Sequence, residues 1–307
     1  MVNSGQTIAS RAAPPYQQRM LRAIQLALLF VFPAAVLVAS IIIDQNYASP
    51  GQANGYVLRI DLPPLKREVG LPQVQGPADA SRPLVVIDPG HGGHDPGAVQ
   101  GSIREKEVTL AIARAIRDDL LDRGGIRVAM TREDDRFLLL GERSAIARRL
   151  RADLFVSVHA DSAESDTARG ASVYVLSQRG SSEAAARFAA RENSADTVNG
   201  VSHEGRSDTV STILMDLSQS EMRGRSAELA ELVLRELRGQ TKLHTDNVQS
   251  AAFAVLKAPD VPSVLFESGY ISNKDDAEFL SSPEGRRLIS DAASRAIRAY
   301  FARQTGV

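Results

Sequence analysis

The chain has 307 residues, 43% of them hydrophobic, so it can form one sizeable folded domain with attachments, or two small domains. Its formal net charge is −1 and its folded part has no basic cluster, so nucleic acid is not an expected partner. Because the chain contains no cysteine, disulfides are excluded and any metal site must use histidine and carboxylate ligands.

An apolar stretch stands out near the N-terminus. No charged residue lies between Ala23 and Ile43, and a stretch of this length spans a bilayer as a helix. Arginines precede it and Asp44 follows it, so residues 1–22 are expected to form a cytoplasmic flank and the rest of the chain to be exported. Residues 23–43 predict either a cleaved signal peptide or an uncleaved signal anchor, and their length favours the anchor. Membrane contact is expected only through this segment.

Residues 44–83 are rich in glycine, proline and glutamine and predict a linker, with one strand-like run at 56–62. From Leu84 onwards, apolar runs alternate with segments of helical periodicity. Strands are predicted at 84–87, 126–130, 154–158, 172–176 and 264–266. Helices are predicted at 107–123, 140–151, 182–193, 225–238 and 283–301.

This alternation predicts an α/β fold in a single catalytic domain at 84–303, with a mainly parallel twisted sheet flanked by helices. Residues 180–245 are long for a simple crossover and polar in their middle. They are therefore predicted to be an insertion on the main fold, and long insertions tend to be functional.

Three predicted strands end in residues that can bind a metal or move a proton. The first stops in the glycine-rich run 88–97, which presents His91, while the others end at His159 and Glu267. In open α/β sheets, the carboxyl ends of the strands line the crevice where ligands bind. A catalytic zinc ion commonly takes three protein ligands and leaves a fourth position to water. Two histidines and a glutamate at one edge therefore predict a metal-dependent site.

The identity of the third ligand stays open at this level. Glu105 and Glu107 both begin the helix after the turn, where a glutamate is ordinarily favourable with the helix dipole. His94 is a rival of His91, and a strand-end histidine is often only a hydrogen-bonded core residue. The glycine-rich run lacks both the P-loop ending and the GxGxxG spacing, so phosphate binding is not expected. Two further histidines lie in polar stretches and are expected to be solvated: His203 and His244.

Six motifs follow one another along the chain: Val85–Gly93, Asp95–Ala98, Arg104–Lys106, Ser157–Asp161, Phe253–Lys257 and Glu267–Asn273. With them, the sequence from about Leu84 to Phe301 resembles the zinc-dependent N-acetylmuramoyl-L-alanine amidases, specifically the branch used in bacterial cell division. Carried over residue by residue, the resemblance makes His91, Glu105 and His159 the zinc ligands and Glu267 the catalytic carboxylate. It therefore selects Glu105 over Glu107.

The resemblance implies a periplasmic enzyme that acts in cell-wall remodelling and daughter-cell separation. Zn²⁺ would activate water to cleave the amide bond between N-acetylmuramic acid and L-alanine of peptidoglycan, while Glu267 accepts and returns the proton. Asp88 is expected either to orient a metal ligand or its turn, or only to cap the turn. Two other functions stay open, namely a zinc peptidase that cuts within the stem peptide and a catalytically silent wall-binding protein.

The same branch implies regulation. Its members can carry an inserted helix that blocks the zinc until a partner with a LytM-type domain removes it, and here that segment would lie within about 180–217. In some relatives a glutamate from this region caps the metal. Many division amidases also carry an N-terminal β-rich domain that binds the wall, for which residues 44–83 are too short. Three side chains near the blocking segment are candidates for the capping role: Gln178, Glu183 and Glu192.

Overall fold

The computed structural model describes residues 70–162, 168–199, 209–258 and 260–304. The chain divides into one unit from Met1 to Pro63 and another from Pro64 to Val307, and every described residue belongs to the second. Among the described helices, none has the length and apolar character needed to cross a membrane. Several predicted segments lie outside the described residues: the flank 1–22, the apolar stretch 23–43, the strand-like run 56–62 and the linker up to residue 69.

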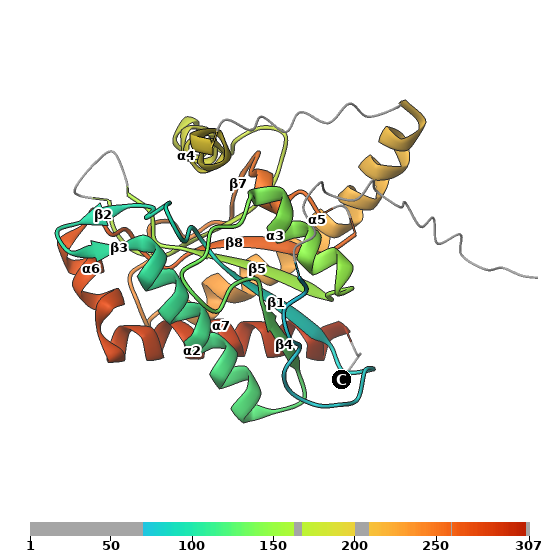
Figure 1. The fold of residues 1–307 in the computed structure, drawn as a ribbon, viewed down its shortest axis with the longest axis horizontal. Coiled ribbons are helices and arrows are strands. Elements are labelled where there is room, and N and C mark those ends of the chain that lie inside the picture. The colour runs from blue at the N-terminus through green and yellow to red at the C-terminus, as the bar shows by residue number, and fades with distance from the viewer. Residues whose placement is uncertain (1–69, 163–167, 200–208, 259, 305–307) are drawn as a thin grey trace, which may run out of the picture. The chain divides into compact units, whose positions relative to one another are not determined.

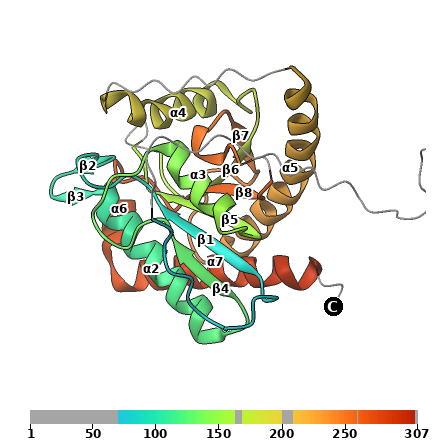
Figure 2. The same cartoon turned by 45° about the vertical axis from the view of Figure 1, so that its right-hand side comes forward.

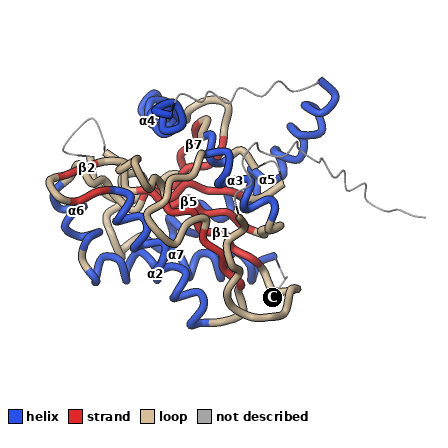
Figure 3. The backbone as a smooth tube through the Cα atoms, viewed as in Figure 1, coloured by secondary structure: helices blue, strands red, loops and turns tan. Residues whose placement is uncertain are grey.

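A six-stranded sheet forms the centre of the domain (Figures 1 and 3). Four parallel strands stand in the order β4–β1–β5–β8, β6 pairs antiparallel with β8, and β7 pairs parallel with β6. The predicted mainly parallel sheet is therefore confirmed, together with its five predicted strands. The strands are β1 (Leu84–Pro89), β4 (Arg127–Met130), β5 (Leu154–His159), β6 (Ser172–Leu176), β7 (Gln249–Ala251) and β8 (Ser263–Glu267).

Helices cover both faces of the sheet (Figures 1 and 2). One face packs against α2 (Glu105–Arg123), α7 (Pro283–Gln304) and the second half of α5 (Thr209–Leu237). The other face packs against α3 (Leu140–Arg149), α4 (Glu183–Asn193) and the short 3-10 helix η2 (Ala254–Leu256). All five predicted helices occur. The prediction missed β7, the hairpin of β2 (Val99–Gln100) and β3 (Ile103–Arg104), both 3-10 helices, η1 (Ser194–Asn199) and η2, as well as α6 (Lys274–Ser281) and the first half of α5.

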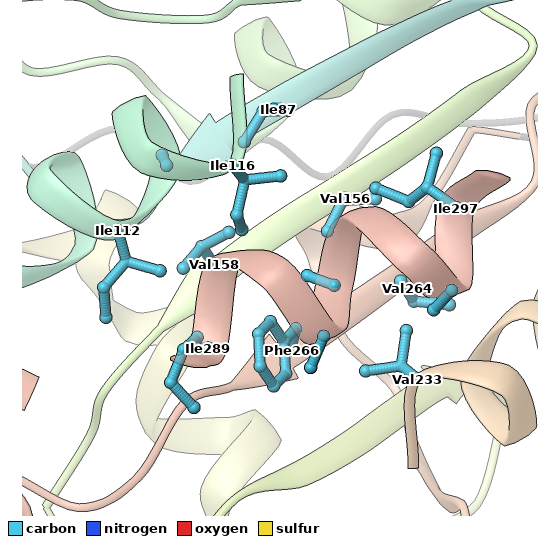
Figure 4. Close-up of a cluster of buried hydrophobic side chains, with 14 of the residues drawn as sticks. Ile87, Ile112, Ile116, Val156, Val158, Val233, Val264, Phe266, Ile289 and Ile297 are labelled. Atoms are coloured by element: carbon cyan, nitrogen blue, oxygen red, sulfur yellow. The ribbon is translucent and has the colours of Figure 1, made fainter. Parts of the chain in front are cut away.

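The alternation of side chains along the strands divides the apolar core in two. Val85 and Ile87 of β1 join the α2 and α7 side, where α2 contributes Ile112 and Ile116 (Figure 4). Leu84 and Val86 point to the opposite face of the sheet and pack on the α3 and α4 side. Successive strand residues point to opposite faces, so the same alternation decides on which face a side chain at the end of a strand lies. Three residues near the strand ends lie on the face that carries α3 and α4: Asp88, His159 and Glu267.

The described end of the predicted linker lies along the sheet. The Gln75 N–H donates to the Val128 carbonyl at 2.8 Å, and the Val128 N–H donates back at 2.9 Å. This antiparallel bridge covers part of the edge of β4, which would otherwise expose unpaired backbone groups.

A glycine in the first turn of α7 sets how closely this helix follows α6. A Cβ atom on Gly285 would lie 1.9 Å from the carbonyl oxygen of Phe279. We predict that Gly285→Ala lowers the free energy of unfolding by about 1–3 kcal/mol, because backbone must move to relieve the overlap. Chemical denaturation would measure the change.

The matched control is Gly224→Ala in α5, where a new Cβ meets no described atom within 4 Å. This variant is expected to gain up to about 1 kcal/mol from helix propensity alone. Equal effects at the two positions would contradict the packing argument.

Candidate metal centre

Two glycines bring the histidine turn of β1 close to β5 and α2. A Cβ atom on Gly90 would lie 2.6 Å from Cε1 of His159, so only glycine lets the turn pass over this ring. A Cβ atom on Gly97 would lie 2.6 Å from Oε2 of Glu105 and 2.7 Å from Cδ2 of His91. Gly97 also has a φ of 66°, which favours glycine. Glycine is therefore required at both positions, because the backbone passes very close to the side chains of the site.

His91, Glu105 and His159 meet at the carboxyl ends of β1 and β5. The Nε2 atom of His91 lies 3.2 Å from Oε1 of Glu105, and Nδ1 of His159 lies 3.3 Å from the same oxygen. One ligand atom from each of the three residues lies within 4.8 Å of the other two. All three side chains are buried. The structure thus brings together the three residues predicted as ligands, in an arrangement that could hold a metal ion.

The donor set fits a divalent metal such as zinc. Within the described residues, Nε2 of His91 and Nδ1 of His159 are buried and have no hydrogen-bond partner. The Nδ1 atom of His91 lies 2.8 Å from Oδ2 of Asp95, so a proton on Nδ1 leaves a lone pair on Nε2. Metal-ligating histidines commonly donate their other ring N–H to a carboxylate in this way. Two unpartnered imidazole nitrogens and one carboxylate oxygen are ordinary zinc donors.

Backbone donors and the histidines keep Glu105 ionised. The Ala98 N–H donates to its Oε2 at 2.8 Å and the Ala160 N–H to its Oε1 at 3.0 Å. Burial alone would raise the pKa of Glu105, but His91 and His159 outweigh it and hold this pKa well below its usual range. Burial alone would lower the pKa of His91, but Glu105 and Asp95 outweigh it and raise this pKa.

The other sequence candidates lie outside this cluster. Glu107 is exposed and pairs with Arg104 at 3.1 Å, so the start of α2 points Glu105 inward and Glu107 outward. His94 is exposed and its ring lies 4.3 Å from that of Phe137. His244 is exposed and lies outside the cluster, whereas the prediction for His203 falls outside the described residues.

Glu267 ends β8 directly beside His159, its partner in the strand register. The Asp161 N–H donates to its Oε2 at 3.1 Å, while its Oε1 is buried without a partner among the described residues. Burial first, and then the nearby carboxylates of Asp161 and Glu105, raise the pKa of Glu267 well above its usual range. Its carboxyl group therefore keeps a proton to a higher pH than an exposed glutamate does.

Among the described residues, Asp88 forms no hydrogen bond with either histidine ring. It accepts hydrogen bonds from Thr131, from Ser157 and from Nη1 of Arg143, the last at 3.0 Å. Arg143 in turn donates to the carbonyls of Pro89 and His91, at 2.7 and 2.8 Å. Asp88 thus anchors an arginine that holds the His91 turn, where φ of His91 is 58°.

Helix α4 closes the site from above. The inward face of α4 carries Glu192, whose Oε2 lies 3.2 Å from Nδ1 of His159 and 3.7 Å from Nε2 of His91. The two other capping candidates are exposed: Gln178 lies before the helix, and Glu183 pairs with Arg187. Of the three candidates, only Glu192 reaches the cluster.

Arg191, the neighbour of Glu192, also contacts the site. Its Nη2 pairs with Oδ2 of Asp161 and donates to the Ser162 carbonyl at 2.8 Å. Burial first, and then Glu192, raise the pKa of Asp161 to about 7. Asp95, Asp161 and Arg191 had no role in the sequence prediction. Asp161 and Asp95 lie within the sequence motifs. The adjacent residues Arg191 and Glu192 on α4 belong to no motif, so the sequence gives no signal for Arg191.

Comparisons with known proteins agree with one another. The family described as N-acetylmuramoyl-L-alanine amidase matches residues 85–299. The chain is 42% identical over 232 residues to the amidase AmiC of Neisseria meningitidis, which covers 75% of this chain and 55% of that protein. It is 38% identical over 239 residues to AmiA of Escherichia coli, and this match covers 77% of this chain and 82% of that protein. The chain thus spans about half the length of the AmiC relative.

The fold also matches solved structures. The structure of the amidase AmiC2 of Nostoc punctiforme matches with a TM-score of 0.51 and 27% identity, covering 72% of this chain and 97% of that one. The structure of the CwlD amidase from Clostridioides difficile, solved with the GerS lipoprotein, matches with a TM-score of 0.52 and 24% identity over 72% of this chain and 98% of that one. The latter likeness concerns the fold alone.

The raised pKa of Glu267 predicts a pH effect on the metal-free protein. Below its ordinary pKa of 4.5, folded and unfolded chains both carry the proton, so burial costs nothing there. Above this value the unfolded chain loses the proton first, so stability falls as the pH rises. Glu267→Gln removes this loss, and its advantage in unfolding free energy is expected to grow by up to about 1.4 kcal/mol per pH unit.

Denaturant unfolding of the two metal-free proteins between pH 4 and pH 8 would measure the difference. The advantage should vanish toward pH 4. A constant difference across this range would contradict the assignment of the buried proton to Glu267.

Proposed function

Because the chain belongs to the N-acetylmuramoyl-L-alanine amidase family, we propose that it is a zinc hydrolase that cleaves the amide bond between N-acetylmuramic acid and L-alanine in peptidoglycan. The observation that carries the proposal is the meeting of His91, Glu105 and His159 at one sheet edge, with two buried and unpartnered imidazole nitrogens. These three residues are the proposed zinc ligands. Zinc bound there supplies a Lewis acid that polarises a carbonyl and acidifies water.

The proposed role of Glu267 is that of a general base and then a general acid. Its free Oε1 accepts a proton from the water that attacks the amide carbonyl, and the proton then passes to the leaving amine of L-alanine. The Asp161 N–H occupies Oε2, which supports the use of Oε1 for this transfer. A raised pKa suits a group that must hold a proton between the two steps. Asp88 supports the site through Arg143 and takes no part in the chemistry.

The proposed resting state is closed. Glu192 lies against both ligand histidines, in the space that a substrate carbonyl would need. Arg191 fastens the same helix to Asp161, which also contacts Glu267. A small cavity, lined in part by His91, His159 and Glu192, lies between α4 and the site. We therefore propose that α4 is the blocking helix, and that an activator, proposed to carry a LytM-type domain, displaces it.

The proposed setting is the periplasm, where peptidoglycan lies, with a role in cell-wall remodelling and daughter-cell separation. In this proposal residues 1–22 stay in the cytoplasm, 23–43 export or anchor the chain, and 44–83 link that segment to the catalytic domain at 84–303. The inserted stretch 180–245 then includes the blocking helix, while the second half of α5 packs in the core.

Digestion of purified sacculi tests the activity. The full chain with Arg191→Ala and Glu192→Ala is expected to release intact stem peptides and leave glycan without them, as mass spectrometry would show. A chelator should stop the release and added Zn²⁺ restore it. Adding Glu267→Gln is expected to abolish release while the protein still binds zinc, because only the proton acceptor is lost.

Each alternative function has its own outcome in this experiment. Shortened peptides would identify a peptidase that cuts within the stem. Zinc binding without any release, by every variant, would identify a silent wall-binding protein. Full activity of the Glu267→Gln variant would contradict the role of this carboxylate.

Comparison of rates tests the closed state. We expect Arg191→Ala with Glu192→Ala to raise the rate above that of the parent by roughly tenfold or more, because about 1.4 kcal/mol of lost closing energy shifts the open population tenfold. The matched control is Glu183→Ala with Arg187→Ala, which removes the same two residue types from the exposed face of the same helix. Equal rates for the parent and both double variants would contradict a role of α4 in blocking the site.

A further inference from the structure

Arg132 follows β4 and is the largest of the fully buried side chains in the described part of the protein. Three of its bonds hold the backbone around the metal centre. Its Nε donates to the Pro89 carbonyl at 3.0 Å, and its Nη2 donates to the carbonyls of Gly90 at 2.7 Å and Lys106 at 2.9 Å. Gly90 directly precedes His91, and Lys106 directly follows Glu105. One guanidinium group therefore joins the two segments that carry these ligands.

A guanidinium in this position is costly. No carboxylate among the described residues forms an ion pair with Arg132, although buried charges in proteins are normally paired. Burial, and then the neighbouring Arg143, lower the pKa of Arg132 to about 10. Neutral backbone carbonyls are thus the main compensation for burying this charge. An apolar side chain would fill the same space without that cost.

The planar fork of arginine explains why this residue suits the position. Its Nη1 reaches the Asp134 carbonyl at 3.1 Å, while its Nη2 bridges two segments of the chain that lie 16 positions apart, from Gly90 to Lys106. A lysine ammonium is a single point and cannot reproduce this spread of donors. Thr109 reinforces the same bridge, because its Oγ1 donates to the Gly90 carbonyl at 3.0 Å and lies 3.3 Å from that of Lys106.

We propose that Arg132 is a positioning residue for the metal centre, which sets the separation of the His91 and Glu105 donor atoms by bridging the backbone beside each of them. This inference rests on the proposed metal site but concerns a residue that no step of the hydrolysis uses. Groups that do not touch the metal but orient its ligands through hydrogen bonds typically contribute 10- to 100-fold to metal affinity. Arg132 acts on the two ligands together because it touches the backbone of both segments.

Removal of Arg132 is expected to spare the fold. Two of the carbonyls that it contacts keep another donor, since Arg143 still reaches Pro89 and Thr109 still reaches Gly90. Replacing a whole buried ion pair by apolar groups of similar size is often neutral for stability, and in the described part of the chain Arg132 has no ion-pair partner that its removal would leave unpaired. The effect should therefore appear in metal binding before it appears in unfolding.

Zinc titration of the metal-free full chain against a competing chromophoric chelator tests the proposal. Arg132→Met is expected to weaken the Kd for Zn²⁺ by about 10- to 100-fold, and Arg132→Lys by less. The visible absorption of the Co²⁺-loaded protein should also change in position or intensity, because it reports ligand geometry. The matched control is Arg136→Met, which removes a half-exposed guanidinium of the same loop that bonds Thr131 but neither ligand segment. It should bind zinc as the parent does.

The outcomes separate this inference from the proposed function. Failure of the parent itself to bind zinc would overturn the metal centre as a whole. Binding by the parent with an equal Kd in Arg132→Met, or equal losses in Arg132→Met and Arg136→Met, would overturn only the role of Arg132. If Arg132→Met does not fold, Arg132→Lys and Thr109→Val decide the matter: each should weaken zinc binding, and parental affinity in both would overturn the proposal.

Discussion

The close passage of the Gly90 turn over the His159 ring is the constraint on which the rest of the site depends. Without a Cβ atom at Gly90, the chain leaving β1 can cross the end of β5 and still present His91 beside His159. This crossing places the ring centroids 5.1 Å apart, at an interplanar angle of 75°. The return of the chain to α2 then passes Gly97, which gives Glu105 the room to reach both rings. A larger side chain at either glycine would separate the ligands before any other part of the fold changed.

Gathering these groups has an electrostatic consequence. Four buried carboxyl groups surround two histidines: Glu105, Asp161, Glu192 and Glu267. Burial first, and then the mutual repulsion of the carboxylates, raises the pKa values of Asp161 and Glu267, so additional positive charge would stabilise their ionised forms. In the closed arrangement, Arg191 supplies part of that charge through Asp161. A metal cation at the proposed ligands would supply more, and the two sources of charge act on neighbouring carboxylates. The metal site and helix α4 are thus coupled through the same carboxylates.

Some of this could be predicted from the sequence because it depends on local patterns. The apolar runs of β1 and β5 are strong strand signals, and the histidines stand where those strands end. The choice of Glu105 over Glu107 could not be made from spacing, since it depends on which face of α2 meets the His91 turn. The resemblance selected Glu105, and the structure places it inside. Likewise, nothing in the sequence distinguishes Arg132 from an ordinary polar residue after a strand, because its burial depends on tertiary packing. The short hairpin β2–β3 has too few residues to show a period.

The packing of α4 indicates what its proposed displacement would require. The core on the α2 and α7 side contains no residue of α4, so displacing the helix would leave the sheet and that half of the core in place. However, Phe188 of α4 packs 5.1 Å from the rings of both Tyr174 and Phe253. Moving the helix away would expose this aromatic cluster to water as well as break the contacts of Arg191 and Glu192, and burying such rings is strongly favourable. Opening is therefore uphill for the chain alone. A partner can shift the balance only by binding the open form more tightly than the closed one, for example by covering the same apolar surface.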